Sequence, residues 1–411
     1  MPLTIASPPG GADSADELWR PTAEGVRDSA ISRFADFLSD RQLGTFSDFQ
    51  ALHQFSIEQR EPFWDAVWDF TGVVAQDKGD RVADDPNRFP CQSQPPVRWY
   101  PGARLNFAEN LLRFRDERIA LVSILEDGRR QSISYGQLYQ NVAGLAAALR
   151  TAGVEAGDRV AGFMPNIIET VEAMLATASL GAVWSSCSPD FGINGVLDRF
   201  GQIQPKVLFS ADGYIYNGKS CDSLERLSAI ADAIPSLERV VVVPLLSQQP
   251  ELADIEGACL WTDFTQSAIG DLDFAQLPFD QPLYIMYSSG TTGMPKCIVH
   301  GAGGTLLQHL KEHRLHVDLV REDVFFYFTT CGWMMWNWLV SGLASGATLV
   351  LYDGSPFADD GQVLLKAIES EGISVFGVSA KYLAALEKAD IVPREVADLS
   401  SLRTVLSTGS P

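Results

Sequence analysis

The chain has 411 residues, and at roughly 100–200 residues per domain this length predicts two or three folding units with a large core. Hydrophobic residues make up 46% and charged residues 20%, which excludes a disordered chain. The 31 Lys+Arg residues against 52 Asp+Glu residues give a net charge of −21, and so acidic a surface repels nucleic acid and anionic membranes. A phosphate-bearing ligand would therefore need a local, built site.

The N-terminal part, as far as Phe70, alternates short helical patterns rich in tryptophan and phenylalanine with polar breaks. Its large aromatic side chains are expected to anchor this part onto the rest of the chain. The polar, proline-containing stretch Val73–Pro96 is expected to be a connector. The expected anchors are Trp19, Phe63, Trp64 and Trp68.

From Ile119 onward apolar strand patterns alternate with helical patterns, which predicts an α/β fold with parallel or mixed sheets covered by helices. The stretch Trp261–Pro282 is expected to be irregular. Strands are expected at Ile119–Leu125, Arg159–Met164, Val240–Val243, Leu283–Tyr287, Cys297–His300, Val324–Phe328, Thr348–Tyr352, Ser374–Val378 and Thr404–Ser407. Helices are expected at Tyr135–Gly153, Glu169–Leu180, Gly304–His316, Trp333–Ser345, Gly361–Glu371 and Lys381–Ala389.

Neither a membrane segment nor a secretory signal is found in the sequence. The apolar runs are too short to cross a bilayer, and the first residues lack the basic and apolar regions of a signal peptide. Six cysteines without a C-x-x-C pair are typical of reduced, mostly buried thiols. These features predict a cytoplasmic location.

The segment Tyr287-Ser-Ser-Gly-Thr-Thr-Gly-Met-Pro-Lys296 carries the strongest chemical signal. Its glycines let backbone N–H groups approach an anion, its hydroxyls add donors, and Lys296 adds a positive charge behind a rigid proline. The segment therefore predicts a polyphosphate cradle. It is not a Walker A loop, because Lys296 is followed by Cys297 where such a loop has Ser or Thr.

This segment resembles the phosphate loop of the adenylate-forming enzymes, which include acyl-CoA synthetases, luciferases and peptide-adenylating domains. Trp99–Asn110 is similar to the N-terminal part of short-chain acyl-CoA synthetases. Thr330–Asn337 and Leu406–Pro411 look most like the acetoacetyl-CoA synthetases within the family. The resemblance implies a cap at residues 1–112, followed by the large AMP-binding domain at residues 113–411.

The resemblance also implies roles for individual residues. The β- and γ-phosphates of ATP would be bound by Ser288, Ser289, Gly290, Thr291, Thr292, Gly293 and Lys296, with Thr292 and Lys296 catalytic. The acyl pocket would be lined by Gly332, Trp333, Met334, Met335 and Trp336, and Trp338 would lie in the core. Adenine would lie beside Gly409, Ser410 and Pro411, and Lys219 would approach CoA.

The implied activity is the ATP-dependent ligation of acetoacetate to CoA with Mg²⁺, through an acetoacetyl-adenylate. Acetate or propionate is the alternative acid, and a nucleotide-binding protein without catalysis is the alternative class. The resemblance places the family's magnesium glutamate and mobile lid beyond residue 411, so we expect this chain alone to be inactive. We also expect it to self-associate through a sheet edge near Thr404–Ser407.

Two other motifs point to different chemistry. His309-Leu-Lys-Glu-His313 matches a zinc-peptidase signature, but no third ligand follows, so these histidines and His316 are interpreted as the solvated face of a helix. Ser379 and Lys381 could form a hydrolase pair, but a serine at the end of a strand is more often a helix N-cap. We therefore predict no metal bound by the protein alone.

Overall fold

The computed structural model describes residues 20–85, 97–266, 271–288 and 293–409. Within these ranges the α-helices are α1 (Ala23–Asp28), α2 (Ala30–Asp40), α3 (Phe49–Glu58), α4 (Arg60–Thr71), α5 (Phe107–Leu111), α6 (Tyr135–Thr151), α7 (Ile168–Ser179), α8 (Ile193–Ile203), α9 (Leu224–Ala233), α10 (Trp261–Thr265), α11 (Ala302–Lys311), α12 (Met334–Val340), α13 (Val363–Glu371), α14 (Ala380–Lys388) and α15 (Pro393–Val396). A π-helical turn (Glu312–His316) extends α11, and 3₁₀ turns form at Ser341–Ser345 and Asp359–Gly361.

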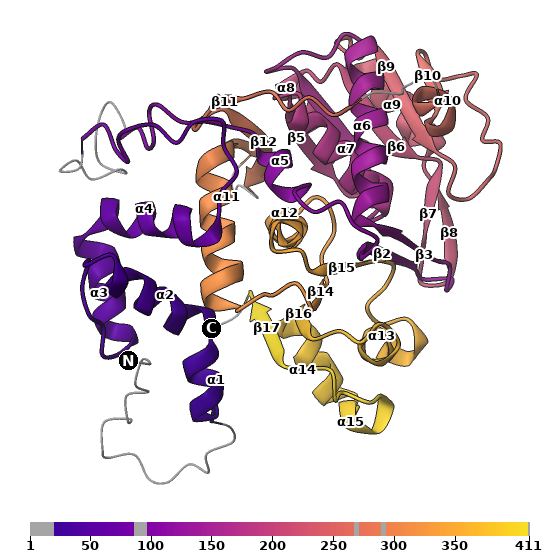
Figure 1. Cartoon of the computed structure of the whole chain (residues 1–411). Coiled ribbons are helices and arrows are strands. Elements are labelled where there is room, and N and C mark those ends of the chain that lie inside the picture. The colour runs from indigo at the N-terminus through magenta and orange to yellow at the C-terminus, as the bar shows by residue number, and fades with distance from the viewer. Residues whose placement is uncertain (1–19, 86–96, 267–270, 289–292, 410–411) are drawn as a thin grey trace.

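The strands of the same ranges are β1 (Arg104–Leu105), β2 (Ile119–Leu125), β3 (Arg130–Ser134), β4 (Arg159–Phe163), β5 (Val183–Cys187), β6 (Val207–Ala211), β7 (Gly213–Tyr216), β8 (Lys219–Asp222), β9 (Arg239–Val243), β10 (Ala258–Leu260), β11 (Leu277–Pro278), β12 (Pro282–Ser288), β13 (Lys296–Gly301), β14 (Val324–Tyr327), β15 (Thr348–Asp353), β16 (Val375–Ser379) and β17 (Thr404–Thr408). The predicted α/β alternation is confirmed (Figure 1).

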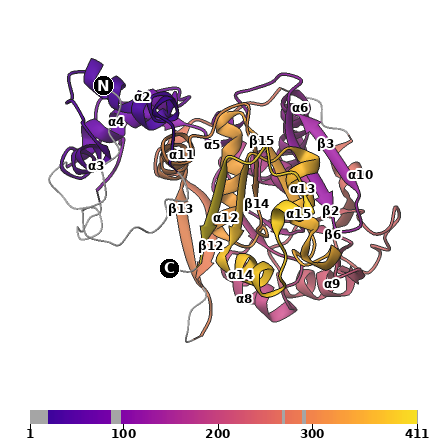
Figure 2. The same cartoon turned by 90° about the horizontal axis from the view of Figure 1, so that it is seen from below.

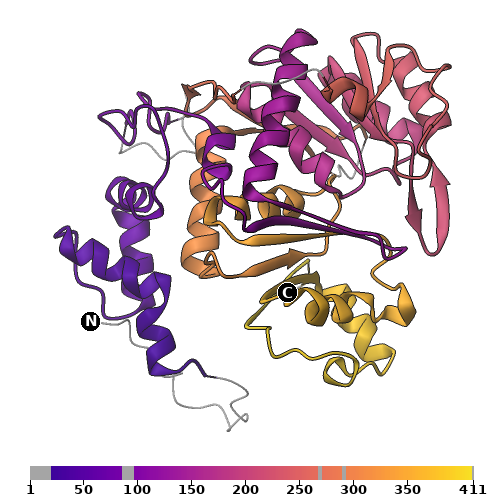
Figure 3. The ribbon, with the colours of Figure 1, turned by 45° about the vertical axis from the view of Figure 1, so that its right-hand side comes forward.

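Two large sheets form the frame of the molecule. The first has the order β10-β9-β6-β4-β5-β12-β13, and the second has the order β17-β16-β14-β15-β2-β3. In each sheet only the last strand, β13 or β3, runs antiparallel to its neighbour. The parallel strands are buried because helices cover them; the helices α13 and α14, for example, pack on the second sheet (Figure 3).

Local sequence explains where the helices begin. At the start of α6 the Ser134 hydroxyl accepts a hydrogen bond from the Gln137 N–H at 3.2 Å, and the Gln137 side chain accepts one from the Ser134 N–H at 3.0 Å. This reciprocal pair satisfies two N–H groups that the first helical turn leaves free. Ser379 caps α14 through a single hydrogen bond, which its hydroxyl accepts from the Tyr382 N–H at 3.2 Å, and this confirms its interpretation as an N-cap.

The helices α1–α4 form a cap that packs against α11 and the π-helical turn (Figure 2). Phe63 and Trp68 are buried, as predicted for anchors, whereas Trp64 is only half-buried and Trp19 lies outside the described residues. The Trp68 ring lies 4.7 Å from that of Tyr100, and Tyr100 lies 4.9 Å from Phe279. Aromatic contacts thus join the cap to the segment that precedes β12.

Some sequence expectations are wrong. The stretch around Trp261 is not wholly irregular, because it contains α10 and β11, and β3 and the β7–β8 hairpin were not predicted. The described cysteines are free, but only Cys187 and Cys331 are buried, so the thiols are not mostly buried. Cys91 lies outside the described residues. No helix in the described ranges is long and apolar enough to cross a membrane.

Candidate functional site

The carboxyl ends of strands from both sheets meet at one place. Gly332 follows β14, and a Cβ atom at this position would lie 3.3 Å from the backbone nitrogen of Ser188, which follows β5. The Ser186 hydroxyl also donates to the Cys331 carbonyl at 2.6 Å. Ligands of α/β proteins bind in crevices at this edge of a sheet. We call this junction the seam.

The two ends of the phosphate segment predicted from the sequence lie on the paired strands β12 and β13, which we call the phosphate hairpin. Ser288 and Lys296 are paired across β12 and β13, and Lys296 is exposed. The Gln202 amide of α8 donates to the Pro295 carbonyl at 2.8 Å, which fastens the hairpin to this helix. Gly293 has φ +126°, a conformation that favours glycine. Ser289, Gly290, Thr291 and Thr292 lie outside the described residues.

The base of this hairpin contains groups that the sequence analysis did not select. The Tyr287 hydroxyl lies 2.9 Å from that of Ser185, which itself donates to the Ile285 carbonyl, so the tyrosine is the donor. Burial raises the pKa of Tyr287, which keeps its proton in place. The Arg199 guanidinium lies 5.6 Å from the Tyr287 ring. Arg199 stands far from the loop in sequence, so only the fold reveals this cation.

The five residues of the predicted acyl segment differ in burial, and Gly332 and Met335 are half-buried. Trp333 and Met334 are 60% and 44% exposed. Trp336 is fully buried, and its indole N–H donates to the Asn166 side-chain oxygen at 2.9 Å. The buried N–H of Trp336 thus has a partner, and Trp336 lines neither of the two grooves described below, so its place in the acyl pocket stays a prediction.

Asn166 joins the two sheets at the seam. Besides accepting from Trp336, its side-chain NH₂ lies 3.4 Å from both the Thr329 and Tyr352 carbonyls. Its backbone N–H donates to Asp353 at 2.7 Å. Burial raises the pKa of Asp353 to about 6, with the negative charges of Asp190 and Glu126 adding to the effect. This node holds the ends of β14 and β15 against the loop after β4.

Two grooves adjoin the exposed acyl residues. The first, which we call the acyl groove, has a volume of about 480 Å³ and lies between β13, α11 and α12. The second has a volume of about 290 Å³ and lies between Met335 and β17. Trp338 is 6% exposed, as expected of a core residue. It nevertheless lines both grooves. The acyl groove is lined by Tyr284, Val299, His300, Gly301, Gly304, Thr305, Gln308, His309, Glu312, Met334 and Trp338.

The expectation that the histidines form a solvated helix face is wrong for two of the three. His309 and His313 are buried, because this side of α11 and of the π-helical turn packs on α12 and β14, whereas His316 is exposed. His309 Nδ1 lies 2.7 Å from the Ser341 hydroxyl, whose own hydrogen goes to the Asn337 carbonyl. His309 is therefore the donor through Nδ1, and burial lowers its pKa to about 3. The described residues hold no group of three or more metal-ligating side chains.

The adenine and CoA predictions lie elsewhere. Gly409 follows β17 with φ +94° and is exposed, while Ser410 and Pro411 lie outside the described residues. Lys219 is exposed at the start of β8, on a β-hairpin and not in the simple turn that the sequence suggested. That hairpin lies on the side of the molecule away from the cap (Figure 1). The Glu126 carboxylate accepts from the N–H groups of Asn217 and Gly218 and so holds the hairpin tip.

Comparison with known proteins gives the same picture. The family model described as "AMP-binding enzyme" matches residues 107–411, and the model described as "Acetyl-coenzyme A synthetase N-terminus" matches residues 49–111. The acetoacetyl-coenzyme A synthetase of Rhizobium meliloti is 50% identical over 96% of this chain and 60% of its own length. The acetoacetyl-CoA synthetase of Gallus gallus is 46% identical, over 96% of this chain and 59% of its own length.

The solved structure of acetoacetyl-CoA synthetase from Streptomyces lividans superposes with a TM-score of 0.90 at 41% identity, covering 96% of this chain and 60% of that one. The chain thus spans about 60% of the length of these relatives. The AMP-binding model extends over both sheets, the phosphate hairpin and the acyl segment. The chain belongs to the AMP-binding enzyme family.

Proposed function

We propose that this chain supplies the ATP-phosphate and acid sites of an AMP-forming acetoacetate–CoA ligase. The observation that carries the proposal is the seam, where the acyl segment after β14 meets the end of β5, the strand that pairs with β12 of the phosphate hairpin. The identity of 50% to an acetoacetyl-coenzyme A synthetase supports acetoacetate as the acid. The residues 1–112 and 113–411 are proposed to be its cap and its AMP-binding domain.

The proposed reaction has two steps. A carboxylate oxygen of acetoacetate attacks the α-phosphorus of ATP, and the bond to the departing pyrophosphate breaks. The thiol of CoA then attacks the acyl carbon, loses its proton and releases AMP. Lys296 and the hydroxyls of Ser288–Thr292 would hold the β- and γ-phosphates, which concentrates positive charge and donors where negative charge develops. The chain's contribution is positioning and electrostatics, without a covalent intermediate on the protein.

The described residues fit ATP better than they fit a free metal ion. Lys296 is exposed at the first residue of β13, and its positive charge can pair with the negative charge of a triphosphate. No group of three metal-ligating side chains is present in the described ranges, so Mg²⁺ would have to arrive with the phosphates, which it commonly bridges. Gly409 and the two residues after it remain the proposed adenine contacts, and Lys219 remains the proposed CoA contact.

The experiment is a paired ATP–pyrophosphate exchange assay. The 411-residue chain is tested alone and joined to the part of the Rhizobium meliloti relative that it does not span. With acetoacetate, the joined protein is expected to exchange pyrophosphate and then form a CoA thioester, with acetate and propionate as weaker substrates. Equal use of all three acids would overturn acetoacetate as the substrate, and absence of exchange with any acid would overturn the ligase itself.

The wider setting is also a proposal. Ketone-body use and lipid metabolism follow from acetoacetate as the substrate, and the cytoplasm is the proposed location because a ligase of this kind draws on ATP and CoA. The proposed partners are small molecules, together with a second copy of the chain at the β17 edge.

A further inference from the structure

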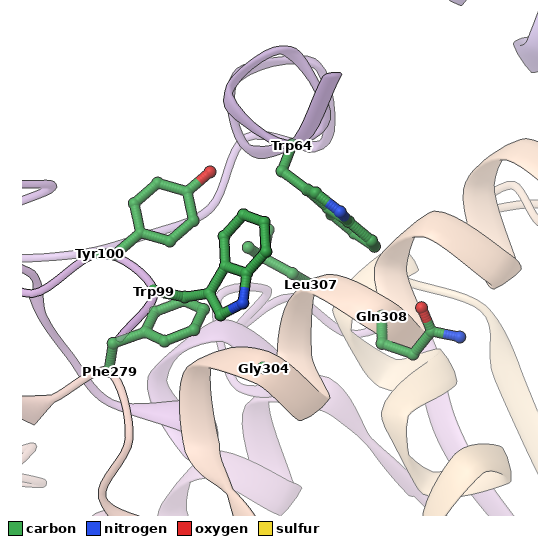
Figure 4. A pocket seen from close by; sticks show the side chains of 7 residues that line it. All are labelled: Trp64, Trp99, Tyr100, Phe279, Gly304, Leu307 and Gln308. Atoms are coloured by element: carbon green, nitrogen blue, oxygen red, sulfur yellow. The ribbon is translucent and has the colours of Figure 1, made fainter. Parts of the chain in front are cut away.

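A pocket outside the acyl groove lies between the cap and α11. It has a volume of about 270 Å³, and Figure 4 shows that Trp64 of α4 faces Trp99 across it. Gln308 is the single side chain among its lining residues that carries an amide, and none of them is charged. We call it the aromatic pocket; it is lined by Trp64, Trp99, Tyr100, Phe279, Gly304, Leu307 and Gln308.

The aromatic pocket and the acyl groove share one stretch of α11. Gly304 and Gln308 line both, because residues four apart lie one above the other on a helix face. Leu307 faces only the aromatic pocket, and Thr305 and His309 face only the acyl groove. The Gly304–Gln308 row is therefore the ridge that divides the two spaces.

Gly304 leaves a gap in this row of side chains. Gly304 has no side chain, and a Cβ atom placed on it would meet no atom within 4 Å. By contrast, a Cβ on the neighbouring Gly303 would lie 2.2 Å from the Phe279 ring, so Gly303 is needed for packing. The Gln308 side chain donates to Glu312 at 2.6 Å and stands on the other part of the ridge. Gly304 is exposed, so the space above it is open to solvent, and the acyl groove and the aromatic pocket adjoin there across the helix surface.

We propose that the aromatic pocket receives the tail of the acid substrate, so that the site takes 3-oxo acids with an apolar or aromatic tail as well as acetoacetate. This inference rests on the proposed function, since it places the acid in the acyl groove. An apolar tail is the occupant that fits, because the lining offers aromatic faces, one leucine and no charge for a phosphate or carboxylate. Aromatic walls also give a phenyl tail favourable ring contacts.

The test compares acetoacetate, 3-oxooctanoate and 5-phenyl-3-oxopentanoate in the exchange assay on the joined protein. Gly304→Val is expected to lower the ratio of tailed-acid use to acetoacetate use by about tenfold or more, as expected when apolar tail contacts are removed. Trp64→Ala, which acts from the cap, is expected to lower the same ratio. Gly201→Val is the matched control, because Gly201 is also an exposed helical glycine with no atom near its Cβ position.

The outcomes separate this inference from the proposed function. An unchanged ratio in both Gly304→Val and Trp64→Ala, or a wild-type protein that uses acetoacetate alone, would overturn the tail pocket and leave the ligase intact. If no acid supports exchange, calorimetric titration of the chain with 3-oxooctanoate decides. Binding that Gly304→Val weakens at least tenfold supports the pocket, and binding that is absent or unaffected by the substitution overturns it.

Discussion

Side chains near the seam are of two kinds, exposed ones and buried ones with hydrogen-bond partners. Trp333 and Lys296 face solvent, where a ligand can reach them, whereas Trp336 and Asn166 are buried and hydrogen-bonded to each other. A buried polar atom is costly when its partner is removed, but an exposed one is not. Substitutions of these residues should therefore separate ligand contacts from structural contacts.

Lys296→Ala is expected to slow pyrophosphate exchange about 100-fold or more, the effect of removing one donor to developing charge. The acid concentration needed for half-maximal rate should change little, because the lysine is placed at the triphosphate. Exchange rates at saturating and limiting acid give both quantities. Lys388→Ala, which removes another exposed lysine, is the control. An unimpaired Lys296→Ala protein would contradict the phosphate assignment.

Trp336→Phe is expected to lower the free energy of unfolding by about 1–3 kcal/mol, because the Asn166 side-chain oxygen loses its donor in a buried site. Denaturant titration measures this change. Trp333→Phe, at an exposed position in the same turn, should change stability by less than about 0.5 kcal/mol. If Trp336→Phe leaves stability unaltered but shifts the preference among acids, Trp336 lines the acyl pocket after all.

At the scale of elements, α6 and α7 pack together with an ionisable group between them. Glu172 is buried on α7 and accepts a hydrogen bond from the Asn141 amide of α6 at 2.7 Å. Burial raises its pKa to about 8, and the nearby Glu169 carboxylate adds to the shift. The folded chain therefore holds this group protonated, whereas the unfolded chain ionises it near the ordinary value of 4.5.

A raised carboxyl pKa makes the contribution of Glu172 complete below pH 4.5 and removes it progressively as the pH rises to about 8. Glu172→Gln keeps a neutral partner for Asn141 and should therefore lessen this loss, so that the variant is relatively more stable at pH 9 than at pH 5. Thermal unfolding at both pH values measures the difference between variant and wild type. Equal differences at the two pH values would show that Glu172 does not titrate within this range.

The elements that the sequence predicted well are those with a clear local pattern. The strands around Ile119, Val240 and Thr348 are continuous apolar runs, and the Ser134 cap marks the start of α6. The β7–β8 hairpin was missed because its strands are short and mix polar with aromatic residues. The tip of the hairpin is held by a hydrogen bond to Glu126, which lies far away in sequence.

In the candidate site, too, only residues that are adjacent in sequence could be predicted. The motif Ser288–Lys296 could be recognised because its residues are adjacent in sequence. The roles of Arg199 and Asn166 could not, since each depends on strands that meet only after folding. The burial of His309 and His313 was misjudged because helical spacing fixes which residues share a face but not whether that face meets solvent or a sheet.

At the scale of the whole molecule, the β17 edge of the second sheet is exposed. The strand β17 pairs with β16 on one side alone, and Val405 on it is 52% exposed. An edge strand with exposed apolar side chains is a template for pairing with another chain. The described part of β13, the last strand of the other sheet, also exposes Ile298 and Val299.

Self-association through β17 is expected to depend on concentration and to decrease in Val405→Lys, because a lysine on an edge strand opposes strand pairing. Sedimentation velocity over a range of concentrations measures the association. Val299→Lys places the same charge on β13 and distinguishes the two edges. A wild-type chain that stays monomeric, or a dimer that Val405→Lys does not weaken, would contradict this prediction.

The seam has a consequence for protein engineering. Its two halves belong to different sheets and are held in register by hydrogen bonds between them, including those of Ser186 to Cys331 and of Asn166 to Trp336. Transplanting the phosphate hairpin alone into another α/β protein would therefore leave behind the acyl segment, which belongs to the other sheet. A working chimera has to exchange both sheets as one block, with its junctions placed in loops remote from the seam.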